Sequence, residues 1–249
     1  MKLDTLIAKS NGKTLYRDGD RCIKLFDSDY SKADVLNEAL NHSRVEGLGI
    51  NMPRILEIMM IDGKWAIISD YIEGKTLARL MEEDPERTEE YLELFVNVQL
   101  DVLSHSAPLL KRLKDKMSDK IEHTDLDACT RYELQARLAG MPKHLKLCHG
   151  DFNPSNVIIS TDGTPYVIDW AHATQGNASA DAARSYMLFK LAGKHAEAER
   201  YLDLFCQKSR TEKKYVQKWM PIVAASQSVK RRENERELLF SWATTVEYH

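Results

Sequence analysis

Short apolar runs separated by turn residues fill the first 72 positions of the chain. Several of these runs are rich in β-branched or aromatic residues or alternate with polar ones, which is typical of strands. The pairs Asn11-Gly12, Asp18-Gly19 and Asp62-Gly63 fall between runs and favour tight hairpin turns. The pattern predicts strands near 5–9, 14–17, 21–26, 55–60 and 65–71.

The stretch between the third and fourth runs has helical spacing instead. Leu36, Ala39 and Leu40 recur at the separations that place side chains on one face of a helix. Ser31 is suited to cap this helix, and Gly47 is suited to end it. We therefore expect one helix, with Leu36, Ala39 and Leu40 on its apolar face.

Beyond residue 73 helical spacing dominates. A short helix is expected after Thr76, and a long one has Tyr91, Phe95, Val98 and Val102 on one face. Further helices are expected near 110–121, 126–139, 197–206, 212–227 and 236–245, and another begins at Ser179. The change of pattern predicts an N-terminal lobe of residues 1–72 and a C-terminal lobe of residues 73–249.

A ribbon of two strands interrupts the helical region. The runs 157–159 and 166–168 are apolar and β-branched, and Asp162-Gly163 between them favours a hairpin. Such a hairpin brings Asn156, at the entry of its first strand, close to Asp169, at the exit of its second. One amide oxygen and one carboxylate suit Mg²⁺. Asp151 lies one loop earlier, where its carboxylate could accept a proton from a substrate hydroxyl.

These residues follow the order of a kinase active site, in which an Asp base precedes an Asn by five positions and a metal-binding Asp follows. His149-Gly150-Asp151, Asn156 and Ile168-Asp169-Trp170 resemble the pattern of the aminoglycoside phosphotransferase and choline kinase-like family. The resemblance covers most of the chain and weakens after about residue 191. It implies an α+β, bilobal protein-kinase-like fold, with a small antiparallel-sheet lobe containing one helix and a larger helical lobe. It also implies that Asp151 is the catalytic base and that Asn156 and Asp169 hold Mg²⁺.

The same resemblance implies a nucleotide site in the N-terminal lobe. Lys24 matches the third-strand lysine that contacts the α/β phosphates of ATP, and Glu38 is placed to pair with it. Asp70, Tyr71 and Ile72 match the hinge whose backbone hydrogen-bonds adenine. Taken singly, a strand lysine or a helix glutamate is more often a surface charge, and a strand leaving its sheet through a turn would explain the hinge equally well.

Two further residues are expected to support the catalytic loop. Asp181 matches an aspartate that braces this loop in the family, although a first-turn acid can also stabilise its own helix. We interpret His149 as a structural hydrogen-bonding residue, because Asp151 already fills the role of base.

The first hairpin departs from the glycine-rich loop of protein kinases. Of its glycines only Gly12 is present, and a Walker A loop is excluded because Ile7 stands where its first glycine is needed. The backbone contacts to the phosphates are therefore looser here or are replaced by Ser10 and Thr14.

Composition excludes several classes of function. The 249 residues include 35 basic and 38 acidic side chains, and the net charge of -3 gives no electrostatic basis for binding nucleic acid or an acidic membrane. Four cysteines without a Cys-x-x-Cys pair indicate neither a disulfide framework nor a zinc site. No apolar run approaches the roughly 20 residues of a membrane span and no signal peptide is evident, so a cytoplasmic location is expected. The acidic segment 82–93 is expected to face water or, alternatively, to attract a cationic substrate.

The sequence thus favours a kinase that uses ATP, or another nucleoside triphosphate, to phosphorylate a hydroxyl of a small molecule such as an aminoglycoside or choline. One alternative is a pseudokinase-like module that binds nucleotide with weak or no catalysis. A protein kinase is less favoured, because Gly150 replaces the regulatory arginine and Trp170-Ala171 replaces Phe-Gly. About ten residues separate Asp169 from Asp181, too few for a peptide-docking activation segment.

Overall fold

The computed structural model describes residues 3, 5–10, 12–229 and 233–244. Asn11 of the first predicted turn, the side chain of Ser10 and the end of the last predicted helix lie outside what is described. The chain forms two compact units, each built from two separate segments. Unit 1 comprises residues 1–83 and 154–172, and unit 2 comprises residues 84–153 and 173–249.

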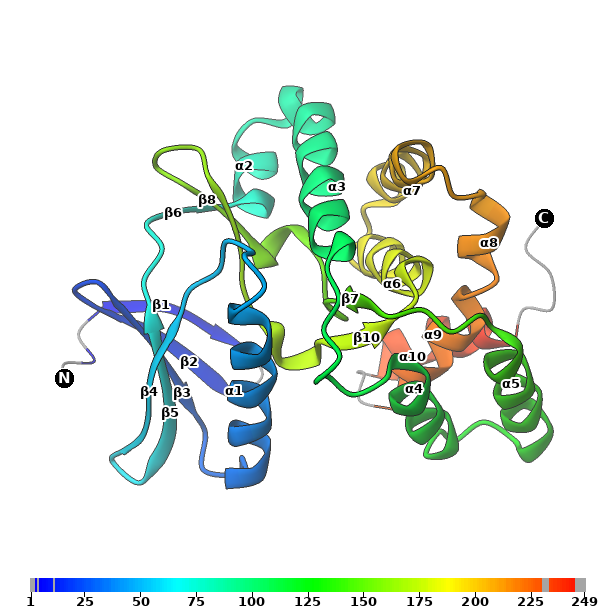
Figure 1. The fold of residues 1–249 in the computed structure, drawn as a ribbon, viewed down its shortest axis with the longest axis horizontal. Coiled ribbons are helices and arrows are strands. Elements are labelled where there is room, and N and C mark those ends of the chain that lie inside the picture. Colours follow the sequence, from blue (N-terminus) through cyan, green and yellow to red (C-terminus); the bar gives the residue numbers. More distant parts are fainter. Residues whose placement is uncertain (1–2, 4, 11, 230–232, 245–249) are drawn as a thin grey trace. The chain divides into compact units, whose positions relative to one another are not determined.

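Unit 1 contains a five-stranded sheet, one long helix and a second, smaller sheet (Figure 1). Its first segment holds β1 (Thr5–Ser10), β2 (Lys13–Asp18), β3 (Arg21–Phe26), α1 (Lys32–Glu46), β4 (Ile55–Ile61), β5 (Lys64–Asp70), β6 (Gly74–Thr76) and α2 (Leu77–Glu83). Its second segment holds the 3₁₀ turn η2 (Pro154–Asn156), β8 (Val157–Ser160), β9 (Pro165–Val167) and η3 (Trp170–His172).

The large sheet has the strand order β1-β2-β3-β5-β4, and every neighbouring pair is antiparallel. The five strands predicted from the sequence are therefore confirmed. Helix α1 packs on this sheet through a core of Phe26, Val35, Ala39 and Ile67. Ser31 caps the helix as predicted, because its hydroxyl accepts a hydrogen bond from the Asp34 N–H at 3.1 Å.

The predicted apolar face of α1 is correct for Ala39 but wrong for Leu36 and Leu40. Val35 and Val45 are fully buried, whereas Leu36 and Leu40 are 40% and 47% exposed. The helix is rotated so that Val35 and Ala39 meet the sheet, and this rotation also turns Glu38 toward Lys24 on β3. Burial of the valines and the ion pair of Glu38 together outweigh exposure of the two leucines.

The small sheet of unit 1 has the order β6-β8-β9. The predicted hairpin around Asp162-Gly163 is present: Gly163 has φ 87° and its N–H donates to the Ser160 carbonyl at 2.9 Å. The Asp162 carboxylate accepts from the Thr164 N–H at 3.0 Å, which closes the turn. Strand β6 was not expected from the sequence.

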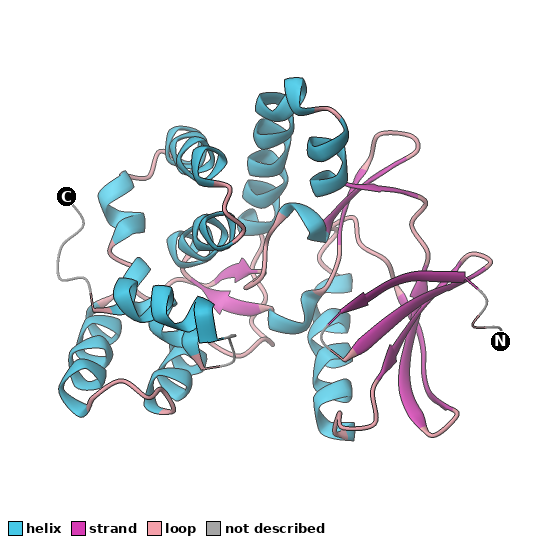
Figure 2. Ribbon diagram, turned by 180° about the vertical axis from the view of Figure 1, so that it is seen from behind, coloured by secondary structure: helices cyan, strands magenta, loops and turns pink. Residues whose placement is uncertain are grey.

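Unit 2 is mostly helical, as Figure 2 shows, and its two short strands pair with each other. It contains η1 (Pro85–Arg87), α3 (Thr88–Ser104), α4 (Leu113–Glu122), α5 (Ala128–Gly140), β7 (Lys146–Cys148), β10 (Thr174–Gly176), α6 (Ala178–Leu191), α7 (His195–Ser209), α8 (Lys213–Gln217), α9 (Met220–Ser228) and α10 (Glu233–Ala243). Aromatic contacts join its elements: Phe95 of α3 meets Phe152 at 4.7 Å and Phe189 of α6 at 5.6 Å between ring centroids.

Two predictions for unit 2 need correction. The helix expected over 212–227 is divided into α8 and α9, because Pro221 lies in the first turn of α9 and favours a new helix start there. Residues 174–176, for which no strand was predicted, form β10 and pair with β7. The lobe boundary predicted at residue 72 remains a prediction; the compact units differ from it because unit 1 extends to residue 83 and includes 154–172.

Within the described part of the chain, every helix is too short or too polar to cross a membrane.

Candidate active site

Lys24 lies between two carboxylates in unit 1. Its Nζ atom is 2.5 Å from Glu38 Oε1 and 3.1 Å from Asp169 Oδ1. Its side chain is 19% exposed, so both ion pairs are partly shielded from water. Residues 14 and 145 positions from Lys24 thus converge on one ammonium group.

Regular structure fixes two of these three side chains. Lys24 is on the central strand β3, where it is paired with Leu15 of β2 and Ile67 of β5. Glu38 projects from α1. Asp169 follows β9 with φ 63°, a left-handed backbone conformation that is uncommon outside glycine. Such strain persists where the surroundings impose it, and it is frequent at functional sites.

The electrostatics of this group keep Lys24 charged. Burial alone would lower the pKa of Lys24, but the Asp169 and Glu38 carboxylates outweigh burial and raise this pKa above its ordinary value. An ammonium that is positively charged at any physiological pH is suited to hold phosphate groups.

Asn156 and Asp169 are brought to the same end of the β8–β9 hairpin. The Ile168 N–H donates to the Asn156 carbonyl at 3.0 Å, and Asp169 is the next residue. The Asn156 side-chain amide oxygen and the Asp169 carboxylate are hard oxygen ligands of the kind that Mg²⁺ binds, so the two residues fit this ion. No cluster of three or more His, Cys, Asp or Glu able to hold a metal occurs in the described ranges. A metal held by these two residues would need substrate and water oxygens to complete its coordination.

The predicted hinge is partly engaged with the protein itself. The Asp70 N–H donates to the Arg54 carbonyl at 3.0 Å and the Tyr71 N–H to the Asp20 carbonyl at 2.8 Å. No backbone acceptor for the Ile72 N–H is found in the part of the chain that the structure describes. Of the three N–H groups of the predicted hinge, only that of Ile72 therefore lacks a backbone acceptor among the described residues.

Asp151 belongs to unit 2, and two side chains hold its carboxylate. Arg184 of α6 donates from Nη2 to Asp151 Oδ1 at 3.1 Å, and Asn153 donates from Nδ2 to Oδ2 at 3.3 Å. The Arg184 side chain is 5% exposed, whereas that of Asp151 is 25% exposed. The carboxylate is thus anchored from the buried side and open to solvent on another.

His149 and Asp181 contact the backbone of the loop that carries Asp151. The His149 ring is fully buried, and its Nδ1 atom accepts a hydrogen bond from the Asp151 N–H at 3.2 Å. Asp181 Oδ1 accepts from the Gly150 N–H at 2.7 Å. Burial raises the pKa of Asp181, although the hydrogen bond from the Gly150 N–H acts in the opposite direction. Both residues therefore contact the loop through its backbone, and their supporting role stays a prediction.

The family model described as the phosphotransferase enzyme family matches residues 13–215. The chain belongs to this family. The matched segment contains Lys24, Asp151 and Asp169, so the predicted family and enzyme class are confirmed. Comparison with curated proteins finds no sequence match.

Solved structures share the fold of this phosphotransferase at low sequence identity. The apo form of a thermostable mutant of aminoglycoside phosphotransferase APH(4)-Ia has a TM-score of 0.68 and 16% identity, covering 96% of this chain and 90% of that chain. Choline kinase LicA from Streptococcus pneumoniae has a TM-score of 0.65 and 14% identity, covering 96% of this chain and 92% of that chain. A complex of the APH(4)-Ia mutant with ADP and hygromycin B has a TM-score of 0.68 and 15% identity, covering 96% and 90%. These likenesses confirm the predicted α+β, protein-kinase-like fold.

Sequence reasoning missed the residues that hold the Asp151 loop of the phosphotransferase. Arg184 was visible only as the residue three positions after Asp181, on the same face of α6. Gln99 of α3 donates to Asp181 Oδ2 at 3.3 Å and to the Ser185 hydroxyl at 3.1 Å, and both contacts are buried. Ser185 donates to the Phe152 carbonyl at 2.7 Å. No local sequence signal marks Gln99, because its partners are more than 80 residues away.

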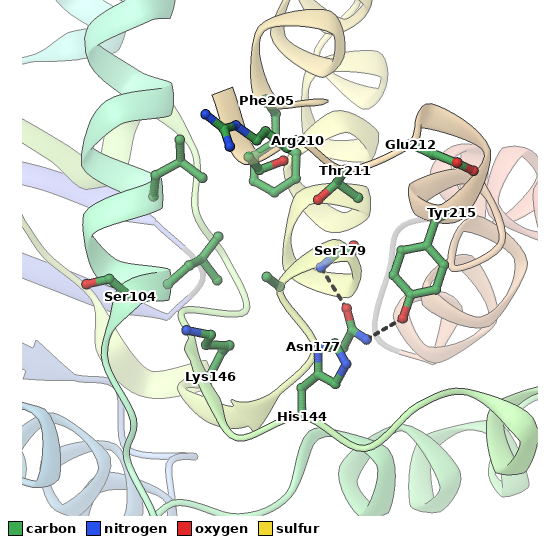
Figure 3. A pocket seen from close by; sticks show the side chains of 14 residues that line it. Ser104, His144, Lys146, Asn177, Ser179, Phe205, Arg210, Thr211, Glu212 and Tyr215 are labelled. Carbon is green, nitrogen blue, oxygen red and sulfur yellow. Dashed lines mark hydrogen bonds between the residues drawn. The ribbon is translucent and has the colours of Figure 1, made fainter. Parts of the chain in front are cut away.

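The phosphotransferase also has a cavity of about 610 Å³ within unit 2, shown in Figure 3. It lies beside the end of α3, the start of α6 and the α7–α8 connection. Asn177 caps α6 by accepting from the Ser179 N–H at 2.9 Å and donates to the Tyr215 hydroxyl at 2.7 Å. Neither Asp151 nor Arg184 lines this cavity, so we do not assign the phosphate acceptor to it.

Three of the seven acidic residues in segment 82–93 form ion pairs with basic side chains. Glu83 binds Lys75 and Arg79, Glu89 binds Arg200, and Glu90 binds Arg87. These ion pairs neutralise part of the segment; its exposure to water and its attraction of a cationic substrate both stay predictions.

Proposed function

We propose that this phosphotransferase transfers the γ-phosphate of ATP to a hydroxyl group of a small molecule. The observation that carries the proposal is the Lys24 ammonium, 2.5 Å from Glu38 and 3.1 Å from Asp169. Phosphoryl transfer needs positioning and neutralisation of charge more than covalent chemistry. An ammonium fixed between two carboxylates supplies a rigid positive group for the α/β phosphates. A structure of the same fold contains ADP, which supports a nucleotide in this role.

The remaining residues of unit 1 fit the other parts of a nucleotide. The Ile72 N–H is suited to donate to the adenine ring. Asn156 and Asp169 would hold Mg²⁺, and this ion when bound supplies positive charge against the phosphate oxygens. Because Asp169 also accepts from Lys24, one carboxylate would serve both the metal and the lysine.

Asp151 is proposed to orient the acceptor hydroxyl and to take up its proton. Arg184 and Asn153 fix both oxygens of the carboxylate, so its orientation is set before the acceptor binds. The backbone of the same loop is held by Asp181 and His149. Because the loop is held at several points, the Asp151 carboxylate is suited to accept a proton without rearrangement of the loop.

A small acceptor fits better than a peptide. The segment between Asp169 and Asp181 forms η3 and β10, and it leads directly into α6. This segment is too short to include a peptide-docking activation segment. Structures with this fold are named for aminoglycosides and choline, and one contains hygromycin B. Aminoglycosides, choline, ethanolamine and neutral sugars therefore form the first panel of acceptors.

The test measures ATP consumption by purified protein with Mg²⁺ and each acceptor of the panel. With an accepted substrate, Asp151→Asn should lower the rate about 10²–10⁴-fold, the usual contribution of a general base. Asp101→Asn is the matched control, because Asp101 is an exposed aspartate on α3 of the same unit. Equal rates in wild type and Asp151→Asn would contradict the proposal. Binding of ATP without transfer to any acceptor would favour the nucleotide-binding module instead.

A further inference from the structure

A second lysine lies on the same carboxylate as Lys24. Lys13 Nζ is 2.7 Å from Glu38 Oε2, while Lys24 Nζ is 2.5 Å from Glu38 Oε1. Each oxygen of Glu38 therefore carries one ammonium. We propose that Lys13 is a second phosphate-binding ammonium, which takes over part of the role of the missing glycine-rich loop. This inference rests on the proposed function.

Strand geometry places Lys13 and Lys24 on one face of the sheet. Lys13 is paired with Phe26, and Leu15 is paired with Lys24. Directly opposed residues share a face of a sheet, and so do residues two apart along a strand. Lys13 is therefore the diagonal neighbour of Lys24, at the end of β2 that follows the first turn.

The backbone and two aromatic rings hold Lys13 at this position. Gly12 has φ 71°, and its carbonyl accepts from the Asp27 N–H at 2.8 Å, which ties the turn to the end of β3. The Lys13 ammonium is 5.2 Å from the centre of the Phe26 ring and 5.6 Å from that of Tyr30. A long side chain that is otherwise flexible is thus confined before any nucleotide binds.

Charge balance gives Lys13 its function. Before Mg²⁺ binds, Lys24 by itself faces two carboxylates, Glu38 and Asp169, so this group without Lys13 would be net negative. A nucleoside triphosphate is itself strongly negative and would be attracted less strongly to such a group. With Lys13 the positive and negative charges of the group are equal in number. Glu38 accepts from only one of the three N–H donors of the Lys13 ammonium. No second acceptor for Lys13 is found among the residues that the structure describes, and its side chain is 21% exposed.

The test compares the dissociation constants of adenosine, ADP and ATP, by isothermal titration calorimetry, for wild type and Lys13→Met. Methionine keeps an apolar stem against Phe26 and Tyr30 but removes the charge. We expect ATP to bind on the order of tenfold more weakly to the variant, as for loss of one charge-assisted contact, ADP less so, and adenosine unchanged. Lys13→Arg, which keeps the charge, should bind ATP more tightly than Lys13→Met.

Lys9→Met is the matched control. Lys9 is in the same hairpin and is paired with Thr14, so it lies on the face opposite to Lys13. This control should bind ATP like the wild type. Should Lys13→Met fail to fold, Lys13→Gln replaces it, because an amide can still donate to Glu38.

Two outcomes would overturn the inference while leaving the proposed function intact. One is an ATP affinity of Lys13→Met equal to that of wild type. The other is an equal loss of affinity for adenosine and ATP, which would show that Lys13 acts on the fold of the lobe rather than on phosphate. Wild-type protein that binds no nucleotide would overturn both the inference and the proposed function.

Discussion

His42 is a partly buried histidine of α1 that makes the stability of this phosphotransferase depend on pH. Its Nε2 atom is 2.6 Å from the Pro53 carbonyl, so the neutral ring donates there. Burial lowers the pKa of His42 below its ordinary value of 6.5, although the Pro53 contact and Glu46 act in the opposite direction. Between the lowered value and 6.5 the unfolded chain binds more protons than the folded one. Stability must therefore fall as the pH drops from 6.5 through this window.

We expect His42→Gln to remove this dependence. Glutamine can still donate to the Pro53 carbonyl but does not titrate, so the free energy of unfolding should change less between about pH 6.5 and pH 5 than in wild type. The difference in slope is at most about 1.4 kcal/mol per pH unit, the limit for one proton. Urea unfolding at several pH values measures it. His144→Gln, at an exposed position, should keep the wild-type slope, and an unchanged slope in His42→Gln would contradict the assignment.

At the scale of single residues, the sequence identified groups that belong to spaced motifs and missed those that do not. Lys24, which the family resemblance matched to the phosphate-binding lysine, contacts both Glu38 and Asp169, although a strand lysine or a helix glutamate carries no signal when taken singly. Arg184 and Gln99 were missed. Each acts through partners distant in sequence, so only packing reveals that a helix residue faces Asp151 or Asp181 rather than water.

Gly74 determines whether β6 can join β8 in the small sheet of unit 1. It is paired with Ser160, and a Cβ atom added to Gly74 would lie 2.8 Å from the Ser160 Cα and would also overlap the Ile159 carbonyl. Both obstacles are backbone atoms, so no side-chain rotation can relieve them. We expect Gly74→Ala to lower the free energy of unfolding by roughly 1–3 kcal/mol, as overpacking does.

The matched control is Gly140→Ala at the end of α5. Nothing lies within 4 Å of a Cβ atom added there, and Gly140 has no positive φ. Alanine should therefore be neutral or stabilise by up to about 1 kcal/mol, because it restricts the unfolded chain. Chemical denaturation of the two variants beside wild type decides the matter. A Gly74→Ala variant as stable as Gly140→Ala would show that β6 shifts without cost.

At the scale of elements, local signals predicted hairpins well and helix faces less well. Turn pairs such as Asp62-Gly63 fix a hairpin through a few neighbouring residues, and Asp62 and Gly63 both have positive φ here, as the tight hairpin turn requires. The face of α1 instead depends on tertiary competition, in which Val35 and Glu38 prevailed over Leu36 and Leu40. Strand β10 escaped prediction because three residues held by β7 carry no periodicity of their own.

At the scale of the whole molecule, the chain crosses between its two units more than once. Residues 154–172 leave the helical unit to complete unit 1. Within unit 1, β6 pairs with β8, the Val167 N–H donates to the Asn51 carbonyl at 2.9 Å, and Asn41 of α1 donates to the Ala171 carbonyl at 3.1 Å. Trp170 is 1% exposed. Unit 1 is therefore incomplete without a segment that follows it by 70 residues, 84 to 153, in the sequence.

This connectivity predicts that residues 1–83 alone do not fold cooperatively. In this fragment β6 would be unpaired, and the Asn41 side-chain amide and the Asn51 carbonyl would lack their hydrogen-bond partners. A small domain has a free energy of unfolding of only a few kcal/mol, which is too little to compensate for these lost contacts. Residues 154–172 joined after Glu83 by a Gly/Ser linker of about ten residues should restore a cooperative transition, since α2 lies against η2 and β8 in unit 1. Urea titrations followed by circular dichroism compare the two fragments, with a shuffled 154–172 segment as control. If residues 1–83 alone unfolded cooperatively, with the same urea midpoint as the joined fragment, residues 154–172 would not be needed for the folding of unit 1 and the prediction would be wrong.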